Sequence, residues 1–216
     1  MITFNKLGRL GLFGNQMFQY ATLYSVAKKN GYDYGVPYAN TGNMQFVNFF
    51  LPNCFKNLSA KDSSQIFNKN IKMENSFLYD ESIFSIKDET DLVGYFQSEK
   101  YFKHCEDIVR KEFTFRDDIV DNVNEFLKPY SGKRLVSVHI RRGDYLKFPN
   151  HHPICNTDYY KEAMELVGDL PFVVVSDDIE WCKQQNVFQS CVFFKGKNKQ
   201  HDLDIITKAQ NNIIAN

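Results

Sequence analysis

The sequence predicts an α/β protein with two domains, each built around a parallel β-sheet. Apolar segments alternate with helical patterns from Lys133 onward, the N-terminus has the order strand, glycine-rich turn and helix, and Pro129 and Gly132 interrupt the pattern between these regions. Strands and helices that alternate at this spacing are joined by right-handed crossovers, which produce parallel sheets. We therefore expect domains at residues 1–130 and 131–216, with a cleft between them.

The predictable elements of the N-terminal domain lie at its two ends. A short apolar strand near Ile2 to Leu7 leads into the turn GRLGLFGNQ, and the helical spacing of MFQYATLYSVAKKN ends at Gly31. Residues 32–89 mix aromatic, Asn and Lys residues without a sustained period, so no element is predicted there. Beyond them we expect a short strand in LVGYFQ, a helix from about Glu99, and a second helix over DDIVDNVNEFLKP.

The C-terminal domain has the more regular pattern. We expect strands at RLVSVHI, FVVVS, CVFFK and NIIA, helices at DYYKEAMELV, DDIEWCKQQ and DLDIITKAQ, and a loop through HHPICNT after the first strand. In an open parallel sheet, ligands bind outside the carboxyl ends of the strands. The residues that directly follow each strand are therefore the first candidates for a site.

Composition and charge exclude several classes of function. Lys+Arg 26 and Asp+Glu 26 give a formal net charge of +0, so no overall field attracts nucleic acid or anionic lipid. We expect no signal peptide and no transmembrane segment, because a run of about 18 apolar residues is lacking. The five cysteines lack disulfide or zinc spacing, which favours reduced thiols in a cytoplasmic protein, either free or peripheral at the inner membrane face.

Several familiar motifs are not supported. His151 and His152 are adjacent in sequence and no carboxylate spacing completes a ligand set, so we expect no metal site. The glycine-rich turn matches neither GxGxxG nor the P-loop pattern, and no GxSxG nucleophile motif occurs. The sequence therefore favours neither a dinucleotide-binding enzyme nor a hydrolase.

A pair of arginines follows the first strand of the C-terminal domain. The segment VSVHIRRGDYL places His139, Arg141, Arg142 and Asp144 at or just beyond the carboxyl end of this strand. A guanidinium group is always charged and can bind two phosphate oxygens at once, so two in succession suit a diphosphate. The alternative is an exposed charged loop that makes surface ion pairs.

A second polar group follows the next strand, in FVVVSDDIEW. Ser176, Asp177 and Asp178 come directly after a buried strand and open a helix. One of these carboxylates can accept the paired N–H donors along one edge of a guanine base. The alternative is helix capping, in which Ser occupies the N-cap and acids occupy the first turn.

A third candidate is the glycine-rich turn before the first helix, GLFGNQMFQYA. Gly14, Asn15 and Gln16 precede a helix whose free N–H groups form an anion site. Asn15 and Gln16 can orient a sugar hydroxyl or a phosphate oxygen. The alternative is that Asn15 is the N-cap of the helix.

Together these segments resemble the bacterial-type α-1,2-fucosyltransferase family, whose donor is GDP-fucose. GNQMFQYA resembles the family's N-terminal signature, GYFQSEKYF its middle signature, and HIRRGDYL the HxRRxD motif shared with α-1,6-fucosyltransferases. DYYKEAM, VSDDIEW and DLDIITKAQNNIIAN continue the match in the family's order, over essentially the whole chain. The resemblance implies two Rossmann-like domains of the GT-B type, an inverting transfer of fucose to the 2-hydroxyl of a terminal galactoside, and no metal or other cofactor.

The resemblance also implies roles for the candidate residues. Arg141 would bind the β-phosphate of the departing GDP, with Arg142 supporting the diphosphate or the loop, because fixed cations must stabilise the growing charge where no metal does so. His139 and Asp178 would recognise guanine. Asn15 and Gln16 would reach the donor from the N-terminal domain, which is the acceptor side.

The acceptor side is less well specified. An inverting transfer calls for a base near the acceptor hydroxyl; Asp144 is the first candidate and Glu99 the second, and a mechanism driven by the departing diphosphate stays open. The aromatic residues of the middle signature, Tyr95, Phe96, Tyr101 and Phe102, can stack on sugar faces, although core packing is the commoner role.

The end of the chain departs from the family pattern. Family members usually continue past IIAN into a serine-rich stretch and further helices, so we expect an incomplete C-terminal domain. Three hypotheses follow: an active fucosyltransferase, a non-catalytic GDP-sugar-binding remnant, and a related transferase that uses another nucleotide sugar. An uncovered apolar sheet face would also favour association of two copies, giving a homo-oligomer.

Overall fold

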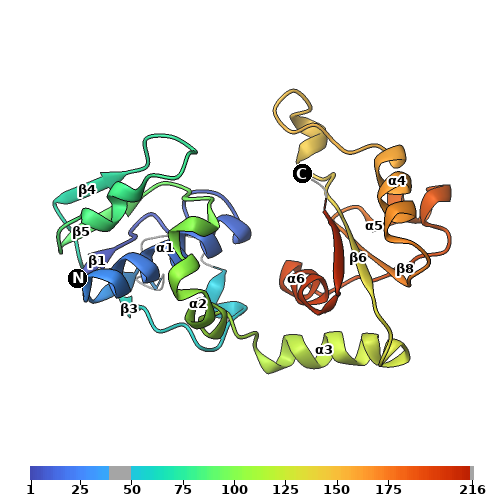
Figure 1. The fold of residues 1–216 in the computed structure, drawn as a ribbon, viewed down its shortest axis with the longest axis horizontal. Helices are drawn as coiled ribbons and strands as arrows, with labels where there is room; N and C mark the ends of the chain where they lie inside the picture. The colour runs from blue at the N-terminus through green and yellow to red at the C-terminus, as the bar shows by residue number, and fades with distance from the viewer. Residues whose placement is uncertain (39–49, 215–216) are drawn as a thin grey trace. The chain divides into compact units, whose positions relative to one another are not determined.

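The computed structural model describes residues 1–38 and 50–214. The chain forms two compact units, Met1–Arg116 and Asp117–Asn216, each with its own parallel sheet (Figure 1). The predicted α/β class is therefore confirmed. The boundary falls before helix α3 (Asp117–Leu127), earlier than the expected division after residue 130, because Val123 of this helix packs with Leu135 and Ile205 of the second unit.

The sheet of the first unit has the strand order β3-β2-β1-β5-β4. The strands are β1 (Ile2–Thr3), β2 (Tyr34–Val36), β3 (Lys61–Asp62), β4 (Asn70–Met73) and β5 (Thr90–Val93), and all neighbours are parallel. The chain moves outward from β1 to β3, and then crosses to the other side of β1, where β5 lies beside it. The strand order therefore reverses between β1 and β5, which is the position where open parallel sheets bind ligands.

The first strand is shorter than the sequence predicts. It ends at Thr3 rather than near Leu7, because the Asn5 N–H donates to the Asp91 carboxylate and the Leu7 N–H donates to the Phe4 carbonyl in a turn. The residues that follow β1 therefore form a loop at the reversal point.

Helix α1 (Phe13–Asn30) carries the chain from β1 to β2. It ends at Gly31, whose φ of 70° gives the left-handed C-cap that the sequence predicts. It begins earlier than expected, at Phe13, so the GNQ residues belong to its first turn.

The middle signature adopts no single helix. Two 3-10 turns, Glu99–Tyr101 and Lys103–Cys105, precede helix α2 (Glu106–Glu112), whereas the sequence predicts one helix from about Glu99. The poorly patterned region before it contributes β2, β3, β4 and the 3-10 turns Leu51–Asn53 and Glu81–Ser85. These elements are too short to show a period in the sequence.

The second unit has the strand order β8-β7-β6-β9, again all parallel. Its strands are β6 (Val136–Ile140), β7 (Phe172–Ser176), β8 (Val192–Phe193) and β9 (Asn211–Ile214), and its helices besides α3 are α4 (Thr157–Val167), α5 (Ile179–Lys183) and α6 (Lys199–Lys208). All four strands and these helices are predicted from the sequence. The strand order reverses between β6 and β9, and this reversal is the topological switch point of the sheet. The residues after β6 therefore lie at the switch point.

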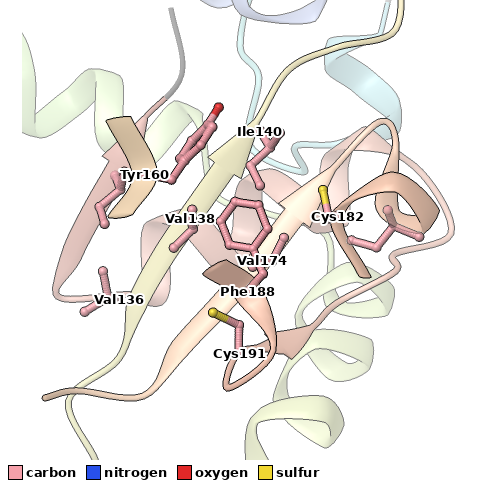
Figure 2. Packing of buried hydrophobic residues seen from close by; sticks show 10 residues of the cluster. Val136, Val138, Ile140, Tyr160, Val174, Cys182, Phe188 and Cys191 are labelled. Atoms are coloured by element: carbon pink, nitrogen blue, oxygen red, sulfur yellow. The ribbon is translucent and has the colours of Figure 1, made fainter. Parts of the chain in front are cut away.

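Helices cover both faces of the central strands β6 and β7, whereas Ile214 of the edge strand β9 is exposed. Val138 of β6, Tyr160 of α4 and Cys182 of α5 belong to one buried cluster on one face of the sheet, which Figure 2 shows. Val173 of β7 packs on the opposite face with Ile205 of α6. Because strands buried on both faces read as continuous apolar runs, the sequence identifies them clearly. They form a rigid support for the side chains that follow their carboxyl ends.

Candidate functional site

The parallel pairing of β6 and β7 brings two polar segments together. Ile140 pairs with Ser176 at the ends of the two strands. The next residues, Arg141 on one strand and Asp177 on the other, therefore emerge side by side at the carboxyl edge. This juxtaposition of an arginine pair with an acidic pair is the principal polar feature of the second unit's sheet edge.

Arg141 is held by two carboxylates. Its Nη2 lies 2.6 Å from Asp144 Oδ1 and its Nη1 lies 3.2 Å from Asp177 Oδ2. The guanidinium also lies 5.4 Å from the centre of the Tyr145 ring. The side chain is only 19% exposed. The expected alternative of an exposed loop with surface ion pairs does not describe this residue, because a largely buried cation is fixed at the strand end.

Arg142 is fixed from a different side. Its Nε lies 3.0 Å from Asp178 Oδ2, and its guanidinium stacks 3.7 Å from the centre of the Trp181 ring. Its side chain is 15% exposed. Guanidinium groups stack well on indole faces, so the two partners together fix the plane of the group.

The acidic segment is engaged within the protein. Asp178 is the N-cap of α5: its Oδ1 accepts a hydrogen bond from the Trp181 N–H at 3.3 Å, while its Oδ2 meets Arg142. The Ser176 hydroxyl accepts from the Asp178 N–H at 2.9 Å. The capping alternative is thus confirmed, with Asp178 rather than Ser176 as the cap. Guanine recognition by Asp178 stays a prediction.

His139 lies one residue inside β6 and is half-buried. Burial lowers the pKa of its imidazole, with the nearby Arg141 adding to the decrease and Asp177 opposing it. A neutral imidazole offers one donor and one acceptor nitrogen, which suits hydrogen bonding to a base. Its predicted contact with guanine therefore remains a prediction that the local electrostatics favour.

Asp202 belongs to the same sheet edge and sequence reasoning missed it. It lies in the first turn of α6, the helix that follows β8. Burial, together with the charge of Asp177, raises the pKa of Asp202 to about 6, although a backbone N–H at Gly196 opposes the increase. Asp202 is the first residue of the segment DLDIITKAQ, whose pattern predicts a helix and gives no sign that this aspartate lies at the sheet edge. The Asn198 N-cap four residues earlier is the signal that places Asp202 in the first turn.

The GNQ residues lie in the first unit. Gly14 is exposed in the first turn of α1, while Asn15 Oδ1 accepts from the Leu12 N–H at 2.9 Å. Asn15 is therefore not the N-cap, which is Leu12, but a first-turn residue that bonds back to it. Gln16 is buried, and its Oε1 accepts from the Phe50 N–H at 2.9 Å. The donor contacts expected of these three residues stay predictions.

Two loops meet at the switch point of the first sheet. The Gln19 amide nitrogen donates to the Leu10 carbonyl at 3.1 Å and to the Gly94 carbonyl at 3.0 Å, joining the loop after β1 to the loop after β5. The Glu74 carboxylate accepts hydrogen bonds from the backbone N–H groups of Tyr95 and Phe96, at 2.7 and 2.9 Å. The N-terminal and middle signatures are thus neighbours within one unit.

The aromatic residues of the middle signature divide between core and surface. Phe96 and Tyr101 are buried and pack against each other, as the commoner role predicts. Tyr95 is half-buried beside Phe77, which is 78% exposed. Glu99, the second candidate base, is exposed near Lys103.

The described residues show no other candidate centre of the expected kinds. Within residues 1–38 and 50–214, no cluster of His, Cys, Asp and Glu is arranged to hold a metal ion. His151 and His152 are exposed, and His152 stacks on Tyr145. All five cysteines lie in the described part of the chain, four of them buried and Cys155 partly buried. In the same part, none of the helices has both the length and the apolar character that a membrane span requires.

Two α/β units, each with its own parallel sheet, give this chain a GT-B-like fold. Solved structures agree on the fold: POFUT1 in complex with GDP aligns over 98% of this chain and 89% of that one, with a TM-score of 0.58 and 12% identity. Fucosyltransferase NodZ from Bradyrhizobium aligns over 94% of this chain and 78% of that one, with a TM-score of 0.55 and 12% identity.

The chain belongs to glycosyl transferase family 11, whose sequence model matches residues 2–216. It is 30% identical to an alpha-1,2-colitosyltransferase of Escherichia coli, over 95% of this chain and 81% of that protein. It is 27% identical to galactoside alpha-(1,2)-fucosyltransferase 2 of Rattus norvegicus, over 99% of this chain and 63% of that protein. The corresponding rabbit enzyme, from Oryctolagus cuniculus, is 28% identical over 85% of this chain and 53% of its own length. The resemblance to the fucosyltransferase family is confirmed, and the chain spans less than two thirds of these mammalian relatives.

Proposed function

We propose that this chain carries out an inverting transfer of fucose from GDP-fucose to the 2-hydroxyl of a terminal galactoside. The observation that carries the proposal is the pair Arg141 and Arg142, fixed by separate carboxylates at the switch point of the second sheet. Family membership and the names of the relatives support transfer of fucose to a galactoside, and a solved structure with the same fold, POFUT1, is in complex with GDP-fucose.

The arginine pair supplies the electrostatic part of the reaction. The acceptor oxygen attacks C1 of fucose from the face opposite GDP, the bond from C1 to the β-phosphate oxygen breaks, and the bonding electrons leave with GDP. Arg141 binds the β-phosphate on which this negative charge collects, and Arg142 supports it from the position fixed by Trp181. Charge-assisted hydrogen bonds in a partly dry site stabilise such a leaving group without any metal.

The proton of the acceptor hydroxyl needs a base, for which Asp144 remains the first candidate and Glu99 the second. Asp144 lies against Arg141, so in this arrangement it also acts as the counter-ion of the phosphate-binding group. The exposed carboxylate of Glu99 belongs to the first unit, on the proposed acceptor side. A transfer driven by the departing diphosphate alone is the third option.

A second candidate function is transfer of another 6-deoxy sugar, with a colitosyl group as the first choice. The 30% identity to the Escherichia coli alpha-1,2-colitosyltransferase, over most of both chains, favours it. A non-catalytic GDP-sugar-binding protein is the third candidate. These three differ in which donor is bound and whether it is consumed.

The test is a transfer assay with GDP-fucose and GDP-colitose, using β-galactosides as acceptors and product linkage determined by NMR. We expect an α-1,2-linked product from GDP-fucose, lost in Arg141→Ala and kept in Arg134→Ala. Arg134 is the matched control because it is exposed at the opposite end of β6. Turnover of GDP-colitose alone would replace the donor assignment, and donor binding without product would establish the non-catalytic protein.

Two expectations about context accompany this proposal. We expect a cytoplasmic protein, because the odd number and scattered spacing of the five cysteines do not suggest a disulfide framework, and disulfides are rare in reducing compartments. Association of two copies stays a prediction, to be checked by light scattering.

A further inference from the structure

Asp177 contacts two consecutive residues of the loop after β6. Its Oδ1 accepts a hydrogen bond from the Arg142 backbone N–H at 2.8 Å, and its Oδ2 lies 3.2 Å from Arg141 Nη1. The Asp177 side chain is 22% exposed. One carboxylate thereby fixes the backbone of one arginine and the guanidinium of the other.

Gly143 makes room for this carboxylate. A Cβ at this position would lie 2.6 Å from Asp177 Oδ2 and 3.2 Å from its Cγ. The φ of Gly143 lies outside the left-handed range, so close approach rather than backbone conformation requires the glycine. The loop after β6 and the acid after β7 therefore fit together as one unit.

The charge of Asp177 argues against direct contact with the phosphates of the donor. A carboxylate repels a diphosphate, and each of its oxygens already faces an arginine donor. Arg141 has further N–H groups beyond the two that face Asp177 and Asp144, since a guanidinium carries five. Asp177 can thus hold the group in place while other donors remain for phosphate oxygens.

The geometry points to Asp177 as a positioning residue that fixes Arg141 and Arg142 for the β-phosphate, with Gly143 as the space that admits its carboxylate. On this inference Asp177 acts through the two arginines, whereas the sequence places it among the substrate-binding residues. The inference rests on the proposed function, because it takes the arginine pair as the diphosphate site. Its consequence is that Asp177 affects the β-phosphate more than the rest of the nucleotide.

The experiment compares the affinities for GDP and GMP, which differ by the β-phosphate, by calorimetric titration of the full chain. We expect Asp177→Ala to weaken GDP about tenfold or more while GMP changes less than about threefold, which is the size expected for misplacing one charged hydrogen-bonding group. Asp177→Asn keeps an oxygen for the Arg142 N–H and should lose less. Gly143→Ala should reproduce the Asp177→Ala pattern.

Asp169→Asn is the matched control, since Asp169 is exposed just before β7, at the opposite end of that strand. It removes the same charge and should leave both affinities unchanged. An equal loss of GDP, GMP and guanosine in Asp177→Ala would overturn the positioning role, because it would indicate a general effect on the site.

A second measurement needs no ligand. Hydrogen exchange of the Arg142 amide should accelerate in Asp177→Ala and stay unchanged in Asp169→Asn, and unchanged exchange in both would overturn the inference.

Different results would contradict the proposed function and the positioning role of Asp177. If Arg141→Ala keeps the wild-type ratio of GDP to GMP affinity, the diphosphate site of the proposed function is wrong. If Arg141→Ala loses the wild-type ratio of GDP to GMP affinity and Asp177→Ala keeps this ratio, only the positioning role is wrong.

Discussion

Arg141 Nη2 lies 2.6 Å from Asp144 Oδ1, so the two residues predicted to be catalytic are partners of each other. Residues in direct contact have coupled energetic effects. We therefore expect the loss of GDP affinity in Arg141→Ala/Asp144→Asn to be close to the loss in Arg141→Ala alone. Calorimetric titration of the two single variants and the double variant tests this, and additive losses would show that Asp144 acts independently of Arg141.

The stack of Arg142 on Trp181 predicts a stability effect in the second unit. The guanidinium lies 3.7 Å from the ring centre, a geometry that contributes on the order of 1 kcal/mol. Arg142→Lys keeps the charge but not the planar group, and Trp181→Leu keeps apolar contact but not the ring face. We expect each to lower the free energy of unfolding in urea by about 1 kcal/mol, with little further loss in the double variant. Additive losses would contradict a direct stack.

Two glycines of the signatures should respond in opposite directions to alanine. A Cβ at Gly94 would lie 2.4 Å from Glu74 Cβ, so Gly94→Ala must displace the carboxylate that holds the loop after β5. A Cβ at Gly14 meets nothing within 4 Å, and alanine in a helix is favoured over glycine by about 0.5–1 kcal/mol. Thermal unfolding should show a lower Tm for Gly94→Ala and an equal or higher Tm for Gly14→Ala.

The same Gly14→Ala variant also tests the predicted donor contact of the GNQ turn. Because the substitution is not expected to destabilise the chain, weaker GDP-fucose binding by this variant would come from the site. Unchanged binding and turnover would remove Gly14 from the set of substrate-binding residues.

Asp202 predicts a pH dependence of stability. Its folded-state pKa of about 6 is above the ordinary value of 3.8, so protonated Asp202 favours the folded state, and this contribution is lost as pH rises through about 6. Asp202→Asn removes the charge that is unfavourable at neutral pH. We expect the free energy of unfolding of the variant, measured in urea, to increase relative to that of the wild type as the pH rises from 4.5 to 7.5.

Comparing wild type with this variant at each pH cancels the contribution of His139, whose lowered pKa makes stability fall as pH drops below its ordinary value of 6.5. The groups that face Asp202 electrostatically are Asp177 and Lys199. A difference between variant and wild type that does not change with pH would contradict the raised pKa of Asp202.

The sequence predicts the second unit better than the first for a physical reason. β6 and β7 are buried on both faces, so they appear as apolar runs, and the polar residues after them are conspicuous. In the first unit, β3 has two residues and β4 is mostly exposed, which leaves no period to detect. The early start of α1 depends on the Asn15 side chain bonding back to Leu12, which no residue-type pattern reveals.

The sequence predicts which residues form the candidate site, but not which of their atoms contact each other. The residues after β6 and β7 are brought together as expected, because parallel strands end at the same edge. Which oxygen of Asp177 faces which arginine depends on the side-chain conformations and on the small size of Gly143. Asp202 is not predicted as a site residue, because its place at the sheet edge depends on where α6 begins and not on its residue type.

The most direct test of the central claim is calorimetric titration of the 216-residue chain with GDP and GDP-fucose, alongside Arg141→Ala and Arg134→Ala. We expect the wild type and Arg134→Ala to bind both ligands, and Arg141→Ala, while folded, to bind them at least about tenfold more weakly, because a charged hydrogen-bonding group is lost. Equal GDP affinity in wild type and Arg141→Ala would contradict the assignment of the diphosphate site to the end of β6.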